Sequence, residues 1–225
     1  MLKAQQAEVL FLNPPVQLRI VPPAARRGSF YQRLGKRAFD LAAASVLLLI
    51  AAPLMLAAAL AIRISMGSGV VFRQRRVGHG GRDFDMVKFR TMKPSRRSEQ
   101  REWAGPDRRV THKSSADPRH TVVGRVLRKT SLDELPQLIH VVRGEMSLVG
   151  PRPEISAIVD REGLRDHVRH SVRPGLTGHW QISHRGTGEM LHECFDVDID
   201  YATNVTFRRD LSLLVQTVSV LTKGS

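Results

Sequence analysis

The hydrophobic pattern is dominated by residues 41–62, a run of 22 residues without a charged side chain and with Ser45 as the one polar residue. A helix of this length would reach about 33 Å, close to the roughly 30 Å hydrocarbon thickness of a bilayer. We therefore expect a membrane-inserted helix. Two alternatives are a cleaved signal peptide, which would begin near residue 1, and a buried helix of a soluble domain, which would normally keep a polar stripe.

The flanks of this run bear on its topology. Basic residues precede and follow it: Arg33, Lys36 and Arg37, then Arg63, Arg73, Arg75 and Arg76. The positive-inside rule then favours the cytoplasm for both ends. Pro53 removes a backbone donor near the middle and disfavours a straight helix. We expect a re-entrant helix-break-helix that dips into one leaflet and returns, with an ordinary kinked transmembrane helix as the alternative.

The rest of the pattern predicts a domain of helices with a small hairpin. Two short strands are expected at 70–73 and 84–89, joined by the glycine-rich turn 78–81. Apolar residues at helical spacing predict helices over 132–142, 155–170 and 210–222. The last of these would pack on the core or lie on a membrane surface. Residues 1–32 are expected to form a flexible arm, and 93–119 a long surface loop.

Charge and composition narrow the classes of protein. The formal net charge is +14, and residues 1–97 carry 17 basic and 4 acidic side chains, so +13 of it lies there. A hydrophobic fraction of 42% argues against wholesale disorder. The single cysteine, Cys194, excludes an internally disulfide-bonded scaffold. The uneven charge requires an anionic partner.

The most informative segment for chemistry is 124–153. Asp133 and Glu134 are adjacent, with Arg128 before them and Arg152 after them. One interpretation is structural, because Ser131 and Glu134 fit a capping box at a helix start. The other is a site for phosphoryl chemistry, in which an aspartate acts as nucleophile, a glutamate holds Mg²⁺ and arginines neutralise phosphates. Spacing alone leaves both open.

Seven ordered motifs then resemble those of one family, over about residues 33–222. They are KRAFD (36–40), FRQRRVG (72–78), KFRTM (88–92), LRKTSLDELPQL (127–138), GEMSLVGPRP (144–153), RPGLTG (173–178) and WQISHRG (180–186). The chain resembles the bacterial sugar transferases, the short monotopic phosphoglycosyl transferases. These move a sugar 1-phosphate from a nucleotide diphosphate sugar to a polyprenyl phosphate.

The resemblance implies roles for individual residues. Asp133 matches the nucleophile that holds the phosphosugar as an acyl phosphate, and Glu134 matches its partner at Mg²⁺, so the two form the expected metal site. Phosphate or nucleotide ligands are expected at Arg128, Arg152, Lys88, Arg90, Arg173 and Arg185. Lys36, Arg37 and Asp40 match an anchoring motif at the membrane entry, and Pro53 marks the break.

The chain departs from the family pattern at three positions. Ala52 stands where a serine usually precedes the proline of the break. His140 replaces a common asparagine after the Asp-Glu pair, and His184 replaces a glycine before Arg185. The two histidines bear on the nucleotide or the sugar, so substrate identity does not carry over directly. The nine histidines show no metal-site spacing and are expected at the surface, and the acidic residues between 189 and 200 are expected on a solvated face.

The expected fold class is therefore α/β, mainly α with a small sheet or hairpin, in a monotopic membrane protein. Its expected parts are the arm 1–32, the re-entrant helix 33–69, and a cytoplasmic catalytic domain 70–225 with interfacial amphipathic helices. The resemblance implies transfer of galactose or glucose phosphate from a UDP-sugar to undecaprenyl phosphate, with release of UMP, as the first membrane step of exopolysaccharide or other glycoconjugate synthesis.

Expected partners are the UDP-sugar, undecaprenyl phosphate, membrane lipids and downstream glycosyltransferases. A homodimer is left open, and nucleic acid is not expected. The expected location is the cytoplasmic face of a bacterial inner membrane. Two rival functions remain: a basic nucleic-acid-binding protein, favoured by the charge, and a catalytically idle membrane scaffold of the same family.

Overall fold

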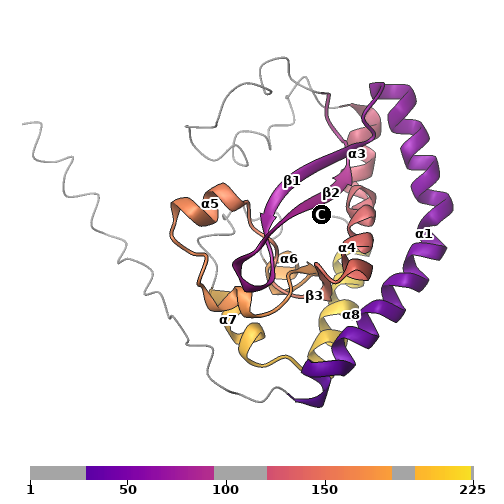
Figure 1. The fold of residues 1–225 in the computed structure, drawn as a ribbon. Helices are drawn as coiled ribbons and strands as arrows, with labels where there is room; N and C mark the ends of the chain where they lie inside the picture. The colour runs from indigo at the N-terminus through magenta and orange to yellow at the C-terminus, as the bar shows by residue number, and fades with distance from the viewer. Residues whose placement is uncertain (1–28, 94–120, 184–195, 224–225) are drawn as a thin grey trace, which may run out of the picture.

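The structure is a computed structural model that describes residues 29–93, 121–183 and 196–223 (Figure 1). The predicted arm and surface loop lie almost wholly outside these residues. The α-helices are α1 (Lys36–Met66), α3 (Val122–Lys129), α4 (Leu138–Arg143), α5 (Ser156–Arg161), α6 (His179–Ser183), α7 (Asp196–Thr203) and α8 (Phe207–Lys223). The strands are β1 (Val71–Val77), β2 (Asp83–Phe89), β3 (Ser147–Val149) and β4 (Gly175–Thr177). Shorter helical turns are η2 (Tyr31–Gly35), η3 (His79–Gly81), η4 (Leu132–Gln137) and η5 (Val168–Ser171).

The apolar run forms α1, a bowed helix along one side of the molecule beside α3 and α4 (Figure 1). Among the described residues, one helix, Tyr31–Met66, is long and apolar enough to cross a membrane. Only 11% of its most apolar window is buried, with a mean hydropathy of 2.6 there. A core helix of a soluble protein would bury most of that window. The exposure therefore disfavours the buried-helix alternative.

The predicted interruption at Pro53 is absent, because α1 continues through Pro53 as one helix. Proline removes a single intrahelical hydrogen bond, and a long helix accommodates that loss by bending. The structure thus replaces the expected helix-break-helix with a continuous, bowed helix. Whether the bow dips into one leaflet stays a prediction.

Three residues at the start of α1 fasten it to the rest of the fold. Lys36 Nζ lies 2.6 Å from Asp210 Oδ2 on α8. Arg37 donates to the carbonyls of Val141 and Val142 at the end of α4, at 2.6 and 2.7 Å. Asp40 is 1% exposed and accepts from the Leu148 N–H of β3. The predicted anchoring motif therefore holds the helix to its own domain.

The predicted hairpin is present, with longer strands than expected. β1 and β2 pair antiparallel from Val71 with Phe89 to Val77 with Asp83. The turn between them contains Gly80, whose φ of 65° lies in the left-handed region that glycine adopts at little cost. β2 packs against η4. This contact places the hairpin beside the Asp133-Glu134 pair.

The second sheet is a short parallel pair in which Ser147 lies opposite Gly175 and Val149 opposite Thr177. Two backbones approach closely beside it. A Cβ atom on Gly175 would lie 2.1 Å from the Gly150 nitrogen, so a side chain at Gly175 would clash with the backbone. The close approach holds the backbone in place at the point where residues 151–154 begin.

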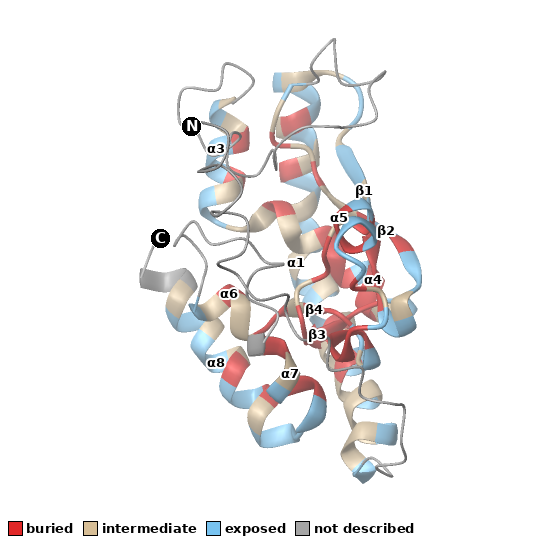
Figure 2. Ribbon diagram, turned by 90° about the vertical axis from the view of Figure 1, so that its left-hand side faces the viewer, coloured by how far each residue is buried: buried red, intermediate tan, exposed pale blue. Residues whose placement is uncertain are grey.

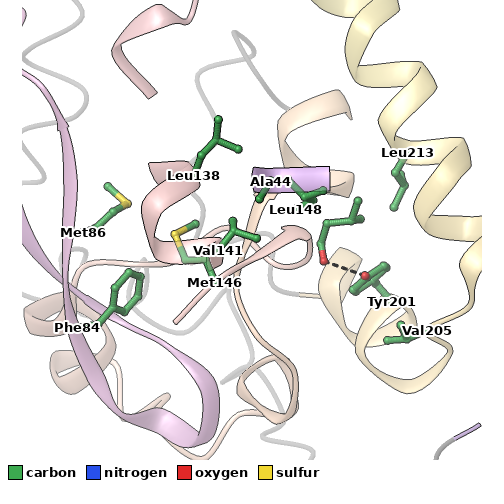
Figure 3. Packing of buried hydrophobic residues seen from close by; sticks show 11 residues of the cluster. Ala44, Phe84, Met86, Leu138, Val141, Met146, Leu148, Tyr201, Val205 and Leu213 are labelled. Atoms are coloured by element: carbon green, nitrogen blue, oxygen red, sulfur yellow. Dashed lines mark hydrogen bonds between the residues drawn. The ribbon is translucent and has the colours of Figure 1, made fainter. Parts of the chain in front are cut away.

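The main core lies between the hairpin, α4, β3 and the C-terminal helices (Figure 3). Its buried members are Ala44, Phe84, Met86, Leu138, Val141, Met146, Leu148, Val149, Tyr201, Val205 and Leu213. A second cluster joins the far part of α1 to the hairpin and α3 through Ala58, Ile62, Phe89 and Leu127. Both ends of α1 consequently pack on the same domain.

Two predicted helices differ in extent. The pattern over 132–142 folds as η4 followed by α4, a 3₁₀ turn through Pro136 and then an α-helix. The helix expected over 155–170 ends at Arg161, and Gly163 follows with a φ of 64°. The helix expected over 210–222 is confirmed as α8, with exposed apolar residues on its outer face (Figure 2).

Burial corrects two expectations about polar residues. His140, His167 and His170 are buried, at 2%, 4% and 7% exposure, although surface positions were expected for most histidines. Asp198, expected on a solvated face, is 1% exposed. In each case a neighbouring polar group compensates the burial, which residue spacing alone does not reveal. Glu189 and Glu193 lie outside the described residues.

Candidate active site

The Asp133-Glu134 pair lies at the start of η4. Ser131 precedes η4 with a φ of 57°, an uncommon left-handed conformation for a residue with a side chain. The Ser131 side chain makes no capping hydrogen bond to η4, although the Glu134 N–H donates to the Ser131 carbonyl at 3.2 Å. The capping-box interpretation is therefore wrong in its side-chain part. Strained backbone of this kind is concentrated at functional sites.

The two carboxylates differ in their surroundings. Asp133 is 7% exposed, and Glu134 is partly exposed. Burial, and secondly the charge of Glu134, raise the pKa of Asp133 to about 6, while Lys88 and Arg128 oppose that rise. A buried carboxylate with few water molecules around it is a stronger nucleophile once it is ionised. The asymmetry suits one nucleophile and one partner.

Lys88 extends from β2 toward this pair. Burial, followed by the charge of Arg76, lowers the pKa of Lys88, while Asp133 and Glu134 oppose this shift. Its Nζ lies 5.4 Å from the centroid of the Phe72 ring on the paired strand. The hairpin thus holds one lysine over the carboxylates.

Arg152 is a second cation beside the pair. Its Nη2 lies 3.6 Å from Glu134 Oε1, and its guanidinium carbon lies 5.5 Å from the centroid of the Trp180 ring. The Trp180 ring packs on the cluster of Val77, Val159 and Leu164. An arginine fork held on an indole face is well placed to meet a phosphate.

The structure brings together Asp133, Glu134, Lys88, Arg128 and Arg152, whereas two other candidates bond to backbone carbonyls. Arg90 donates from Nη2 to the Met66 carbonyl at 2.7 Å and so satisfies the C-terminal end of α1. Arg173 donates from Nε to the Gly144 carbonyl at 2.9 Å, beside an open cavity of about 290 Å³. The predicted role of both in phosphate binding gains no support from these contacts. Arg185 and His184 lie outside the described residues.

His140 has a structural place in this arrangement. Its Nε2 accepts from the Val87 N–H at 3.0 Å, so the proton is on Nδ1, which donates to Glu145 Oε2 at 2.6 Å. Val87 precedes Lys88 on β2. His140 therefore holds the strand that carries Lys88 and lies too deep to touch a sugar.

The donor set fits Mg²⁺ rather than a metal held wholly by protein. In the parts of the chain that the structure describes, no group of three or more His, Cys, Asp or Glu residues could hold a metal ion. Mg²⁺ commonly binds one or two carboxylates and completes its shell with substrate phosphates and water. Asp133 and Glu134 supply that number of protein ligands.

Sequence reasoning missed two arginines near the site, Arg76 and Arg169. Both are buried, at 7% and 1% exposure. Arg76 donates to the Pro153 carbonyl, and Arg169 donates to the Arg152 carbonyl. Arg76 lies inside the family motif FRQRRVG, and this position could have marked it as a candidate site residue. Arg169 lies in the stretch expected to be a helix with surface histidines, so the pattern gave no reason to single it out.

Comparison with known proteins gives a consistent result. The family profile of the bacterial sugar transferases matches residues 31–224. The exopolysaccharide production protein ExoY of Rhizobium meliloti is 44% identical over 180 residues, which is 77% of this chain and 75% of that protein. A UDP-glucose:undecaprenyl-phosphate glucose-1-phosphate transferase of Caulobacter vibrioides is 42% identical over 217 residues, 93% of this chain and 78% of that protein. An undecaprenyl-phosphate galactose phosphotransferase of Salmonella typhimurium is 36% identical over 94% of this chain, which matches 45% of that protein.

Proposed function

Because the chain belongs to the bacterial sugar transferase family, we propose that it transfers a sugar 1-phosphate from a UDP-sugar to undecaprenyl phosphate and releases UMP. The observation that carries this proposal is the buried Asp133, with Glu134 beside it and the cations Lys88, Arg128 and Arg152 around it. A diphosphate is the ligand that three converging cations and a metal-binding carboxylate would take. The similar proteins named above support the same reaction class.

The proposed chemistry has two steps. A carboxylate oxygen of Asp133 attacks the phosphorus atom that is bonded to the sugar, the bond from that phosphorus to the bridging oxygen breaks, and UMP leaves. A phosphate oxygen of the lipid then attacks the same phosphorus, which frees the Asp133 carboxylate and yields the lipid diphosphate sugar. Lys88, Arg128 and Arg152 hold the phosphate oxygens and stabilise charge that develops on them.

Mg²⁺, held by Glu134 and Asp133, would supply further neutralisation of the diphosphate. Glu134 is suited to this task because it is more exposed than Asp133 and reaches the same space as Arg152.

The proposed location is the cytoplasmic face of a bacterial inner membrane, with α1 in one leaflet. Both ends of α1 pack on one domain: Lys36 on α8 at the start, and the Met66 carbonyl on Arg90 at the end. A straight transmembrane helix would carry its ends to opposite sides and could not make both contacts. The residues that remain exposed include Leu47, Leu49, Ile50, Leu54 and Leu56. They would form the face that meets lipid.

The test uses the full-length protein in nanodiscs, without lipid acceptor. UMP release should then stop after one equivalent, and intact mass should rise by one phosphosugar. Asp133→Asn should abolish both signals and leave membrane association unchanged, whereas Asp160→Asn, at an exposed position of α5, serves as the matched control. Full UMP release by the Asp133→Asn variant would overturn the proposed covalent step.

The sugar is proposed to be glucose or galactose. The comparison proteins named for a sugar include a glucose and a galactose transferase. A panel of UDP-glucose, UDP-galactose and their N-acetylated forms, read by UMP release, tests this choice. Turnover confined to an N-acetylated sugar would contradict it.

A further inference from the structure

The segment Pro151–Glu154, which carries Arg152, has all four of its backbone carbonyls engaged. The Pro151 carbonyl accepts from the Gly175 N–H at 2.8 Å, and the Glu154 carbonyl accepts from the Val77 N–H at 3.0 Å. The two carbonyls between them accept from side chains: Arg152 from Arg169 Nη2 at 2.7 Å, and Pro153 from Arg76 Nη1 at 2.9 Å. The segment is thus held at every residue, twice by arginines that come from elsewhere in the chain.

Both of these arginines are buried together with a carboxylate. Arg169 is 1% exposed, and its Nη2 lies 2.7 Å from Asp198 Oδ2. Arg76 is 7% exposed, and its Nη1 lies 3.6 Å from Oε1 of the buried Glu154. Each guanidinium therefore binds a carboxylate and a backbone carbonyl at once, and in each case one terminal nitrogen, Arg169 Nη2 or Arg76 Nη1, makes both contacts. A lysine ammonium has no such fixed geometry.

Stability is a poor explanation for this arrangement. Two buried ion pairs carry a large desolvation penalty, and replacing such pairs with apolar residues is often neutral or stabilising. What they do supply is direction, because a fork paired with a buried carboxylate holds its remaining N–H groups in one orientation. Here the fixed fork directs Nη2 of Arg169 to the Arg152 carbonyl and Nη1 of Arg76 to the Pro153 carbonyl.

We propose that Arg76 and Arg169, together termed the arginine clamp, are positioning residues that fix the backbone of Arg152 so that its guanidinium meets the substrate phosphates. They hold the main chain of Arg152, while Trp180 supports the Arg152 guanidinium, whose carbon lies 5.5 Å from the Trp180 ring centroid. The clamp rests on the proposed function, since Arg152 needs a phosphate to position.

The first measurement is the rate of UMP release by full-length protein in nanodiscs. Arg169→Lys keeps the charge but loses Nε and the planar arrangement of N–H groups that serves Asp198 and the Arg152 carbonyl together. We expect kcat to fall by about 10- to 100-fold, the scale of a misplacement of about 1 Å, with a smaller change in KM. Arg165→Lys is the control, because the Arg165 side chain bonds to Asp83 and to the Gly81 carbonyl and not to residues 151–154.

A double variant guards against simple unfolding. Arg169→Met combined with Asp198→Leu removes both buried charges together, so that neither is left unpaired. The thermal unfolding midpoint should then stay within a few degrees of wild type, while kcat falls as in Arg169→Lys. Should Arg169→Lys also fail to fold, Arg76→Lys provides the same comparison from the other arm of the clamp.

The decisive measurement repeats these variants in an Arg152→Ala background. A residue that acts only through Arg152 has nothing left to position there, so the further loss in single-turnover UMP release should be less than about twofold. An undiminished, additive loss in that background would overturn the clamp and indicate a general structural role. If wild type releases UMP and the clamp variants are equally active, the clamp alone is overturned. If wild type releases no UMP, the proposed function is overturned and the clamp with it.

Discussion

At the scale of single residues, the site depends on polar side chains whose burial is matched by specific partners. His140 shows this dependence clearly. It was singled out from the sequence because it departs from the family pattern, and the hypothesis was that it bears on the nucleotide or the sugar. Its bonds to the Val87 N–H and to Glu145 instead connect α4 with the strand of Lys88.

We predict that His140→Phe destabilises the protein and leaves sugar preference unchanged. Phenylalanine leaves the Val87 N–H buried without an acceptor, which costs about 1–3 kcal/mol of unfolding free energy. His140→Gln is the matched control, because its side-chain oxygen can accept from the same N–H. Denaturant titration measures the stability, and UMP release from the sugar panel measures the preference. A switch of sugar in either variant would contradict the structural role.

The burial of His170 predicts that the stability of the protein depends on pH. Its Nδ1 donates to the Arg165 carbonyl at 2.9 Å, and Arg165, His167 and Arg169 are the charged or titratable groups that face it. Burial, followed by the charge of Arg169, lowers the pKa of His170 to about 4. Between the ordinary value of about 6.5 and this value, the unfolded chain binds a proton that the folded chain does not.

The free energy of unfolding should therefore decrease as the pH falls from about 6.5 toward about 4, by at most about 3 kcal/mol from this group. His170→Asn keeps a donor for the carbonyl and does not titrate, so the decrease should be smaller in that variant. Thermal unfolding in detergent at pH 7.5 and pH 5 measures the difference, with His79→Asn on the exposed turn as control. Equal pH dependence in wild type and His170→Asn would count against this origin.

At the scale of elements, local patterns were sufficient where one periodicity dominated. The hairpin and α8 follow from alternation and helical spacing, and both are present. The helix expected over 155–170 is shorter because Gly163 adopts a left-handed conformation and the chain turns back. Spacing records which residues are apolar, but it does not record the long-range pairs, such as Arg169 with Asp198, that override helix formation.

The candidate site shows the same division. The pair Asp133 and Glu134, with Arg128, Arg152 and Lys88, was singled out from motifs, and the structure brings these residues together. Arg90 and Arg173 carry the same charge in similar motifs, yet they donate to backbone carbonyls at Met66 and Gly144. Whether an arginine meets a phosphate or completes a helix end is decided by tertiary distances, which a linear motif does not contain.

The attachment of the first turn of α1 to α8 leads to a prediction about stability. Asp210 is fully buried and accepts from Lys36 Nζ, Tyr31 Oη and Tyr201 Oη, each at 2.6 Å. Asp210→Asn removes the charge that pairs with Lys36 and should destabilise the protein by about 3–5 kcal/mol, the cost of a buried unpaired charge. Lys36→Met combined with Asp210→Leu should recover part of that loss. Thermal unfolding tests this order, and equal stability of both variants would contradict it.

At the scale of the whole molecule, the surplus positive charge has more than one use. Lys36 and Arg37 are turned to protein partners, and Lys88, Arg128 and Arg152 surround the carboxylates. A smaller share than the net charge suggests is therefore available to lipid headgroups. Membrane association should depend chiefly on the exposed apolar face of α1, since burying each such side chain contributes about 1.5–3 kcal/mol.

Because the ends of α1 bind the protein and its apolar face is exposed, the structure leads to a prediction about topology. If both ends of α1 stay on the domain, single cysteines introduced in a Cys194→Ser background at exposed Leu34 and exposed Ser68 should react from the same side of a sealed inverted vesicle. A cysteine at exposed Leu49, in the middle of the apolar face, should be shielded from a membrane-impermeant maleimide and become reactive in detergent. Labelling of positions 34 and 68 from opposite sides would establish a spanning helix. A spanning helix could not keep both the contact of Lys36 with Asp210 and that of Arg90 with Met66. These two contacts are what hold both ends of the bowed helix on one domain.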